Sequence, residues 1–297
     1  MLSQTENRVI LGDVREIVDT FQDNFFQAIV TSPPYFGHRN YSKSENGKEI
    51  GQESDLKSYI SNLVGVFREL RKKLKTNGLL WLNLGDTYRK RTLLGIPWRV
   101  ALALQDDGWT LRSDIIWHKP NAMPSSIKDR PTIDHEYVFM FAKSQEYYYN
   151  ADAIREPHIT FTEKSRMKGG RKHFGRINGT PESGKNSGKS NLHDGRWDQA
   201  FHPRGRNKRT VWEIPLSKFR DVHFAVYPEK LVEICLLAST KEQDFVLDPF
   251  TGSGTTGVVA CKLLRRFIGI ELVSEYQAMA QKRIDNFNLQ HNLFDHA

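Results

Sequence analysis

Short apolar runs alternate along the chain with longer segments in which apolar residues recur every three or four positions. Short apolar runs are typical of buried strands, and a recurrence of three or four positions is typical of helices. In chain order, the predicted strands have the sequences RVILG, FFQAIVTS, LLWLNLGD, DFVLDPF and RFIGIEL. Strands that alternate with helices in this way predict an α/β fold with a doubly wound, mainly parallel sheet.

The most regular helical segment is DLKSYISNLVGVFRELRKKL, for which we expect an end at Asn77 and Gly78. Helical spacing places its apolar side chains on one face, namely Leu56, Tyr59, Ile60, Leu63, Phe67, Leu70 and Leu74. Further helices are expected to start at Pro97 and Pro228, because proline is favoured in the first helical turn. The segments LRSDIIWHK and EYVFMFAKS predict an antiparallel strand pair.

One segment, residues 155–210, lacks this periodicity. It is rich in Gly, Ser, Lys and Arg and holds few apolar residues, so it can hardly form a core of its own. We therefore expect one domain of residues 1–154 and 211–297 with an irregular basic insertion. Such an insertion is either a solvated loop or a nucleic-acid contact. Its aromatic residues, among them Phe174 and Trp197, favour the contact because rings stack on bases.

The composition excludes several classes of protein. With 297 residues, 38% of them hydrophobic, the chain is long enough for one large domain. No apolar run is long enough to cross a bilayer and the N-terminus is too polar for a signal peptide, so we expect a cytoplasmic protein. Cys235 and Cys261 lack a CxxC partner, which favours reduced core cysteines, and we expect no metal site. The net charge of +8 favours a polyanionic partner.

A glycine-rich turn follows the predicted strand DFVLDPF. Gly252, Gly254 and Gly257 form a GxGxxG pattern, and Glu271 ends the next strand, 19 residues after Gly252. In this geometry a ligand approaches the glycine backbone and the carboxylate accepts hydrogen bonds from ribose hydroxyls. The pattern alone also fits a nicotinamide dehydrogenase. Asp248 favours instead a cofactor with an ammonium group, because it places a carboxylate between the strand and the first glycine.

A second unusual segment is TSPPY, residues 31–35, at the end of the strand FFQAIVTS. Its two prolines restrict the backbone and end the strand, so we expect a rigid loop. Both this loop and the glycine-rich turn follow apolar strands, and the carboxyl ends of parallel strands form one rim where ligands bind. Taken alone, the loop also fits an ordinary strand-ending turn.

Together these segments resemble the DNA amino-methyltransferases. TSPPY and DPFTGSGTTG are similar to the catalytic and S-adenosylmethionine segments of the subgroup in which the catalytic segment comes first. Further motifs match in the family's order, namely GDVREIV, LWLNLGDTY, DIIWHKPNAMPSS, RPTIDHEYVFMFAKS and HFAVYPEKLVEICL. Only the basic insertion lies outside the resemblance. The resemblance implies a Rossmann-like methyltransferase fold, S-adenosyl-L-methionine as the cofactor and double-stranded DNA as the substrate.

The glycine-rich turn and this resemblance also predict the site residues. The cofactor-binding set is Asp13, Asp248, Pro249, Phe250, Gly252, Gly254, Thr255, Thr256 and Glu271. The catalytic set is Ser32, Pro33, Pro34, Tyr35 and Asp86. In the family, the positions of the Ser32 hydroxyl and the Pro33 carbonyl are implied as acceptors for the target amine. Tyr35 is expected to stack on a base flipped out of the duplex.

Several of these residues have a second interpretation. Asp86 either orients Ser32 or caps a helix or turn, and Asp13 either binds the cofactor or is a turn residue. Residues in WHKPN either line the target-base pocket or have packing and surface roles, and these are Trp117, Lys119 and Asn121.

For DNA binding we predict Lys119 and two basic clusters of the insertion. The clusters are Arg166, Lys168, Arg171 and Lys172, and Arg204, Arg206, Lys208 and Arg209. We expect no comparable run of acids to offset them. In the family this part of the chain usually holds the target-recognition region, which is the role we expect for residues 155–210.

In the family, a serine before the two prolines occurs mostly in cytosine-N4 enzymes. The resemblance therefore predicts site-specific cytosine-N4 methylation by direct transfer, with adenine-N6 methylation as the alternative. Carbon-5 methylation is excluded because it needs a cysteine nucleophile, usually beside a proline, and neither cysteine has one. A nicotinamide oxidoreductase and a catalytically silent nucleic-acid binder remain as further alternatives. We expect a role in a restriction-modification system and no membrane partner. The presence of a cognate restriction endonuclease and the oligomeric state stay open.

Overall fold

The structure, a computed structural model, describes residues 7–37, 49–157, 204–216 and 227–294. The chain divides into two compact units, of which the larger comprises Met1–Asn150 and Thr210–Ala297 and the smaller Ala151–Arg209. Most of the smaller unit lies outside the described residues, so its role as a target-recognition region stays a prediction.

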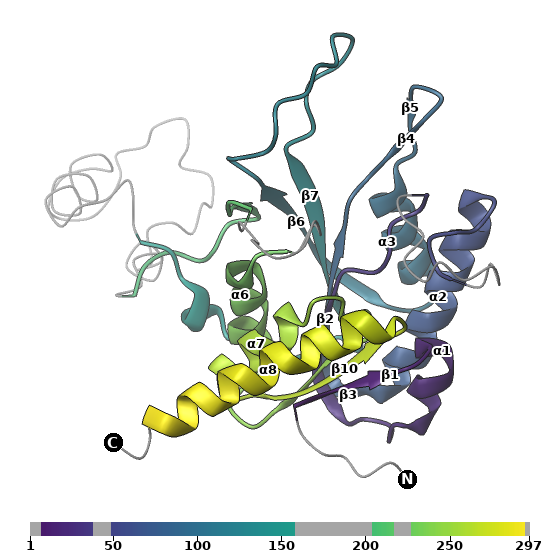
Figure 1. The fold of residues 1–297 in the computed structure, drawn as a ribbon. Helices are drawn as coiled ribbons and strands as arrows, with labels where there is room; N and C mark the ends of the chain where they lie inside the picture. The colour runs from purple at the N-terminus through teal and green to yellow at the C-terminus, as the bar shows by residue number, and fades with distance from the viewer. Residues whose placement is uncertain (1–6, 38–48, 158–203, 217–226, 295–297) are drawn as a thin grey trace, which may run out of the picture. The chain divides into compact units, whose positions relative to one another are not determined.

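The larger unit is built on an 8-stranded sheet with the strand order β1-β10-β9-β2-β3-β7-β6-β8 (Figure 1). The strands are β1 (Arg8–Leu11), β2 (Phe26–Thr31), β3 (Leu74–Leu84), β6 (Thr110–His118), β7 (His135–Ala142), β8 (Val211–Glu213), β9 (Phe245–Asp248) and β10 (Arg266–Glu271). A separate hairpin consists of β4 (Tyr88–Arg89) and β5 (Thr92–Leu93).

Most strand pairs of this sheet are parallel. The strands β1, β10, β9, β2 and β3 form a parallel series, and β6 runs parallel to β8. Only β7 runs against its neighbours in the described sheet, β3 and β6. The predicted α/β fold, with its mainly parallel sheet and the antiparallel pair of β6 and β7, is therefore confirmed. The sequence did not predict β4, β5 and β8, because runs of two or three residues carry no periodicity.

Helices cover both faces of the sheet (Figure 1). They are α1 (Val14–Ile17), the 3₁₀ turn η1 (Val18–Thr20), α2 (Leu56–Lys73), α3 (Ile96–Asp106), α6 (Glu229–Ser239), α7 (Thr255–Lys262) and α8 (Ser274–Phe294). Successive residues of β3 point to opposite faces. Leu80 and Leu82 join the core formed with α2 and α3, whereas the Trp81 indole donates to Ser239 Oγ of α6 at 3.1 Å.

The helix α2 buries its predicted apolar face but ends earlier than predicted. Its fully buried apolar residues include Tyr59, Leu63, Phe67 and Leu70. The helix ends at Lys73 and β3 begins at Leu74, so the predicted end at Asn77 and Gly78 is wrong. The reason is tertiary, because Leu74 pairs with Phe26 of β2 and is thereby drawn into the sheet.

The smaller unit begins with the 3₁₀ turn η2 (Ala151–Ile154). An antiparallel bridge joins Glu156 to Arg206, with backbone N–H to carbonyl distances of 2.9 and 2.8 Å. Gly205 has a φ of +107°, and a side chain there would collide with the carbonyl of Glu156. The close approach of the two segments therefore depends on glycine.

Both cysteines are buried and neither forms a disulfide bond. Burial raises the pKa of the Cys261 thiol to about 11 and also raises the pKa of the Cys235 thiol well above its ordinary value. The thiols therefore stay protonated at neutral pH, and the prediction of reduced core cysteines is confirmed.

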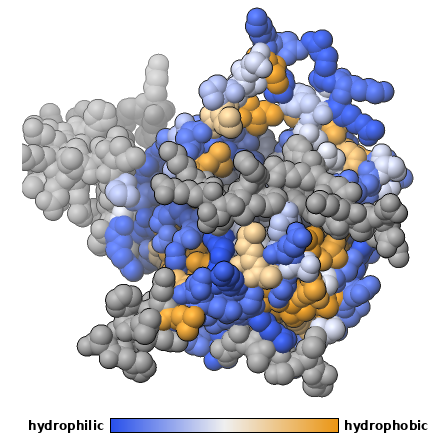
Figure 2. Space-filling model, viewed as in Figure 1, coloured by the Kyte–Doolittle hydropathy of each residue, from blue (hydrophilic) through white to orange (hydrophobic). Residues whose placement is uncertain are grey.

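The described helices include none that is long and apolar enough to cross a membrane. The face seen in Figure 2 is mainly hydrophilic, with apolar residues in small groups between polar ones. Among the most exposed large apolar side chains are Met123, at 83% exposure, and Leu289, at 63%, and they belong to distant parts of the sequence.

Candidate active site

A pocket of about 400 Å³ opens where the parallel strands β1, β2, β3, β9 and β10 end. Because β7 runs in the opposite direction, its amino end lies at the same rim. The predicted site residues in the lining are Asp13, Ser32, Pro33, Pro34, Tyr35, Lys119, Pro249, Phe250, Gly252, Thr255 and Glu271. Of the predicted catalytic and cofactor-binding residues, four lie outside the lining, namely Asp86, Asp248, Gly254 and Thr256. The TSPPY loop and the glycine-rich turn thus face one cavity.

The glycine-rich turn between β9 and α7 brings backbone atoms to this cavity. Gly252 and Gly254 have φ values of +54° and +82°, which favour glycine. A side chain on Gly254 would lie 2.9 Å from the Cβ of Ala280 in α8, which is too close. At Gly252, by contrast, an added Cβ meets no atom within 4 Å. The turn therefore packs against α8 on one side and leaves open space on the other.

Glu271 is buried at the end of β10 and lines the pocket. Its two oxygens accept hydrogen bonds from the amides of Gly252 at 2.8 Å and Val273 at 2.9 Å. Burial raises the pKa of this carboxyl, although the two amides oppose the rise. An ionised carboxylate has more lone pairs than these two bonds use, so Glu271 retains capacity for a hydroxyl in the pocket.

Asp248 lies inside the protein with 0% exposure rather than at the pocket surface. Its carboxylate accepts from Thr31 Oγ1 at 2.7 Å, Tyr227 OH at 2.9 Å, Thr256 Oγ1 at 2.6 Å and the Phe250 amide at 3.1 Å. Burial raises its pKa, and these donors oppose the rise. We therefore correct its predicted role as the partner of an ammonium group. Asp248 instead holds Thr256 and the two pocket loops together.

Asp13 combines the two roles that the sequence left as alternatives, because it caps α1 and also lines the pocket. Its Oδ1 accepts from the amide of Arg15 at 2.8 Å, and its carboxylate pairs with the Arg15 guanidinium. Burial opposes ionisation of Asp13, but the hydrogen bonds and charge of Arg15 outweigh burial and lower the pKa. An ionised carboxylate is thus available at the end of β1.

The TSPPY loop is held in place by contacts with α2 and β3. The Tyr59 phenol donates to the carbonyl of Pro34 at 2.9 Å. A side chain on Gly85 would lie 2.7 Å from the Tyr35 ring, so glycine allows this ring to pack against the end of β3. None of the described residues donates to the carbonyl of Pro33, which therefore remains available to a ligand.

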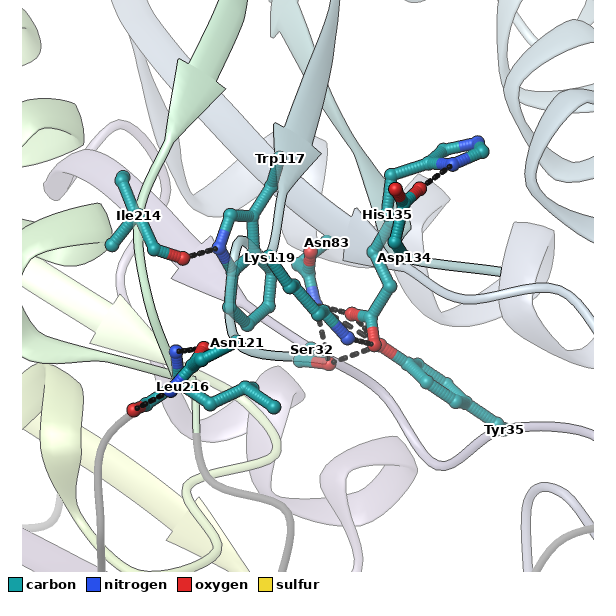
Figure 3. A network of polar contacts seen from close by, with 11 residues as sticks. Ser32, Tyr35, Asn83, Trp117, Lys119, Asn121, Asp134, His135, Ile214 and Leu216 are labelled. Atoms are coloured by element: carbon teal, nitrogen blue, oxygen red, sulfur yellow. Dashed lines mark hydrogen bonds and ion pairs between the residues drawn. The ribbon is translucent and has the colours of Figure 1, made fainter. Parts of the chain in front are cut away.

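Two residues that the sequence analysis did not single out, Asn83 and Glu136, complete a polar network at Ser32 (Figure 3). Asn83 Nδ2 lies 3.3 Å from Ser32 Oγ, 2.9 Å from Tyr35 OH and 2.8 Å from Glu136 Oε2. Ser32 donates to Tyr35 OH at 3.2 Å, and Tyr35 donates to Glu136 Oε2 at 2.8 Å. Lys119 pairs with the other Glu136 oxygen. Burial and the charge of Glu136 raise the pKa of Tyr35 well above 10.0.

A signal for both missed residues is present in the sequence. Asn83 is the one polar residue in the apolar run LLWLNL, and Glu136 precedes the apolar run YVFMFA. Each is therefore a polar group next to a strand that is otherwise buried. Their shared position could not be inferred, because it depends on the antiparallel pairing of β7 with β3.

Some residues of the WHKPN segment line the pocket, and another holds a neighbouring loop in place. Trp117 and Lys119 line the pocket, with Lys119 Nζ 4.5 Å from the centroid of the indole ring. The Trp117 indole donates to the carbonyl of Ile214 at 2.8 Å. Asn121 lies outside the lining and exchanges two hydrogen bonds with the backbone of Leu216, at 3.1 and 2.7 Å. Trp117 and Lys119 thus have the predicted pocket position, whereas Asn121 fixes a loop.

Asp86 caps a helix and does not orient Ser32. Its Oδ1 accepts from the amides of Thr87 at 2.9 Å and Ile96 at 3.1 Å, and Ile96 is the first residue of α3. The capping interpretation is therefore correct, and the catalytic assignment of Asp86 is wrong. The polar neighbour of Ser32 from β3 is Asn83.

The second predicted DNA-binding cluster, residues 204–209, is offset by acids of the same unit. Arg204 pairs with Asp152 at 2.7 Å, and Arg206 and Lys208 pair with Glu156 at 3.2 and 3.0 Å. The sequence analysis expected no comparable run of acids to offset this cluster. Two single acids offset three of its cations instead, and they lie 50 to 52 residues from their partners in the sequence. The first cluster lies outside the described residues, and comprises Arg166, Lys168, Arg171 and Lys172.

We expect Asp248→Ala to destabilise the fold, because it leaves buried hydroxyls and one amide without an acceptor. The free energy of unfolding should fall by about 3 kcal/mol, against about 1 kcal/mol for Asp86→Ala, which removes only a helix cap. Urea denaturation followed by circular dichroism measures both values. A smaller loss for Asp248→Ala than for Asp86→Ala would contradict the central position of the buried carboxylate.

Comparisons with known proteins agree with this geometry. A family model described as DNA methylase matches residues 26–282. The type II methyltransferase M.SmaI of Serratia marcescens is 38% identical over 306 residues, which cover 93% of this chain and 90% of M.SmaI. The solved PvuII DNA methyltransferase, described as cytosine-N4-specific, has a TM-score of 0.66 at 21% identity and covers 94% of this chain and 90% of its own.

A second solved structure carries the cofactor. It is a Thermus thermophilus protein described as a DNA modification methylase, in complex with S-adenosyl-L-methionine. Its TM-score is 0.60 at 26% identity, and the match covers 94% of this chain and 93% of that one. The similarity in each case extends over nearly the whole chain.

Proposed function

The chain belongs to the DNA amino-methyltransferase family, and we propose that within this family it methylates the N4 amine of cytosine in duplex DNA. As a member it is a DNA methyltransferase, and its cofactor is S-adenosyl-L-methionine. The observation that carries the choice of base is Ser32, because a serine before two prolines resembles the cytosine-N4 enzymes. Adenine-N6 methylation is the alternative.

The pocket residues fit this cofactor at its nucleoside end. Glu271 retains acceptor capacity for the ribose hydroxyls, and the open side of Gly252 leaves space beside the backbone. Asp13 and Arg15 line the pocket at the neighbouring end of β1, where we place the adenine. Asp248 is buried behind the turn, so it is not the partner of the cofactor's ammonium group in this proposal.

The residues at the other end of the pocket prepare the target amine. S-adenosyl-L-methionine, when bound, supplies an electrophilic methyl group. The exocyclic amine is a weak nucleophile, because its lone pair is delocalised into the ring. The Ser32 hydroxyl and the Pro33 carbonyl accept from its two N–H bonds and favour a pyramidal nitrogen as charge develops. The proline backbone keeps the carbonyl from moving away.

A flipped base would meet aromatic and charged groups in this pocket. Trp117 and Tyr35 line it beside Ser32, and Lys119 is held between the indole ring and Glu136. Aromatic faces bind planar bases by stacking, and an ammonium donates to ring nitrogens and carbonyls. These residues therefore form the target-base pocket in our proposal.

Cations at the same rim suit a phosphate backbone. The β4–β5 hairpin projects beyond the end of the sheet, as does the loop between β6 and β7 (Figure 1). Arg89, Lys90 and Arg91 at the hairpin tip are exposed, and Arg91 pairs with Asp129 of that loop. Lys90 and Arg91 have φ values of 48° and 64°, which are uncommon for such residues. We add this hairpin to the basic insertion as a DNA contact.

A restriction endonuclease is the second partner in this proposal. The relative M.SmaI is a type II methyltransferase, and such an enzyme protects the sites that its endonuclease cuts. Protection of host DNA requires that the protein act in the cytoplasm.

Nucleoside mass spectrometry of DNA from cells that express the protein tests the choice of base. We expect N4-methylcytosine, which is absent from cells with the Ser32→Ala variant. N6-methyladenine in its place would support the alternative and overturn the cytosine assignment. Sequencing of the modified positions gives the recognition sequence in the same experiment.

We expect Ser32→Ala to slow methyl transfer far more than it weakens cofactor binding. An acceptor that acts as charge develops is commonly worth about 10²- to 10³-fold in rate. Single-turnover kinetics measures the rate, and calorimetry measures the cofactor affinity. Ser32→Thr, which keeps the hydroxyl, should retain part of the activity. Wild-type kinetics in Ser32→Ala would remove this hydroxyl from the mechanism.

We expect Glu271→Gln to weaken cofactor binding about tenfold, because an amide oxygen accepts a weaker hydrogen bond than a carboxylate. Burial raises the pKa of Glu271 above its ordinary 4.5, so it protonates before exposed glutamates as the pH falls. Cofactor affinity should therefore fall on acidification in the wild type and in the control Glu275→Gln, but not in Glu271→Gln. Calorimetry at several pH values gives the comparison, and an equal pH dependence in all three would contradict it.

The two basic clusters should differ in their effect on DNA binding. Each phosphate contact contributes about 0.9 units to the slope of log affinity against log salt. Alanine at Arg166, Lys168, Arg171 and Lys172 should flatten this slope strongly. Alanine at Arg204, Arg206, Lys208 and Arg209 should flatten it less, because Asp152 and Glu156 already offset the first three of these cations. Equal slopes in both variants, measured by fluorescence anisotropy, would contradict this ranking.

A further inference from the structure

The hydrogens around Ser32 point toward one carboxylate. Glu136 accepts from Tyr35 and Asn83 on Oε2 and from Lys119 on Oε1. An ionised carboxylate has no hydrogen to donate, so each of these three neighbours must be the donor. The carboxylate therefore sets the direction of every hydrogen bond that leads to it.

The carboxylate also fixes which way the hydrogen bond of Ser32 runs. The one hydroxyl hydrogen of Tyr35 goes to Glu136 at 2.8 Å, so Tyr35 can only accept from Ser32, which lies 3.2 Å away. Ser32 in turn receives a hydrogen from Asn83 at 3.3 Å. One lone pair of Ser32 then remains for a ligand in the pocket. The serine is thus held as an acceptor for an N–H group.

The carboxylate at the end of these hydrogen bonds is largely buried, as is the ammonium paired with it. The side chains of Lys119 and Glu136 are only 16% and 17% exposed. Burial and the charge of Glu136 raise the pKa of Tyr35, so its phenol is protonated at neutral pH and can pass a proton on. A proton released at Ser32 therefore meets a connected base inside the protein before it meets bulk water.

We propose that Ser32, Tyr35 and Glu136 form a relay that takes the proton from the target amine. The proposal rests on the methylation of an exocyclic amine and holds for cytosine and adenine alike. The nitrogen bonds to the methyl carbon while the carbon–sulfur bond breaks, and that electron pair stays on sulfur. The surplus proton on nitrogen passes to Ser32, the Ser32 proton to Tyr35 and the Tyr35 proton to Glu136. Glu136 ends as a carboxylic acid, and both hydroxyls are restored.

Lys119 has a defined part in this charge balance. Before the step its ammonium is paired with the Glu136 carboxylate. After the step Glu136 is neutral, so the positive charge that arrived with the sulfonium remains on Lys119. An uncompensated ammonium beside a carboxylic acid favours loss of the proton to water once the pocket opens. The relay is thereby reset for the next turnover.

Tyr35→Phe is the direct test, because it removes one hydroxyl and keeps the ring for stacking. We expect single-turnover methyl transfer to slow about 100-fold and its solvent deuterium isotope effect to disappear. Cofactor affinity, measured by calorimetry, should not change. The matched control is Tyr59→Phe, which removes the hydroxyl that supports Pro34 in the same loop and should keep the isotope effect. A wild-type rate and isotope effect in Tyr35→Phe would overturn the relay.

Glu136→Gln separates a relay from independent supporting roles. The two substitutions interrupt one path, so the double variant should be no slower than the slower single variant. Losses that add would show that Tyr35 and Glu136 act separately and would overturn the proposal. If Glu136→Gln does not fold, the comparison of Tyr35→Phe with Tyr59→Phe still decides.

A readout without turnover comes from the hydroxyl proton of Tyr35 in the cofactor-free protein. We expect a downfield proton resonance that is absent from Tyr35→Phe and moves upfield in Glu136→Gln. Lack of this resonance in the wild type would contradict the hydrogen bond on which the relay depends. Failure of the proposed function is a different result, because DNA would then stay unmethylated by the wild type while the resonance persists.

Discussion

The carboxylate of Asp248 accepts hydrogen bonds from four segments at a point that solvent does not reach, among them Tyr227 just before α6. Thr31 comes from the end of β2, Phe250 from the glycine-rich turn and Thr256 from α7. Ser32 directly follows Thr31, so the catalytic loop and the cofactor turn share one buried anchor. Their separation is fixed by the protein before any ligand binds. Methyl transfer depends on such positioning, since the reacting atoms must approach to about 3 Å in line.

The pocket also depends on the reversed direction of one strand. A parallel sheet presents the carboxyl ends of its strands at the binding rim. Because β7 runs the other way, it presents its amino end there, and Glu136 lies opposite Trp117 of β6. This places a carboxylate with a side chain only 17% exposed within reach of Lys119, Asn83 and Tyr35. The pair of charges can then direct the polar hydrogens around it rather than be screened.

Features that are continuous in the sequence were predictable, whereas those that join distant segments were not. The alternation of strands and helices and the two pocket loops follow from local patterns. Asp248 was assigned to the ligand because the sequence does not show its contact with Thr31, which is 217 residues away. Asp86 and Asn83 lie close together at the end of one strand, and only the packed structure shows which of them faces Ser32. The end of α2 at Lys73 likewise depends on the pairing of Leu74 with Phe26 of β2. Helical propensity, which is a local property, does not predict such a pairing.

The bridge between Glu156 and Arg206 has a consequence for how this chain can change over evolution. The two residues bring the ends of the proposed recognition segment together at its base. When the ends of a segment are joined, each doubling of its length costs only about 0.6 kcal/mol in closure entropy. Segments of quite different length can therefore replace one another above the same base at little cost in stability. A lineage could acquire a new target sequence by such an exchange while inheriting the methylation chemistry unaltered.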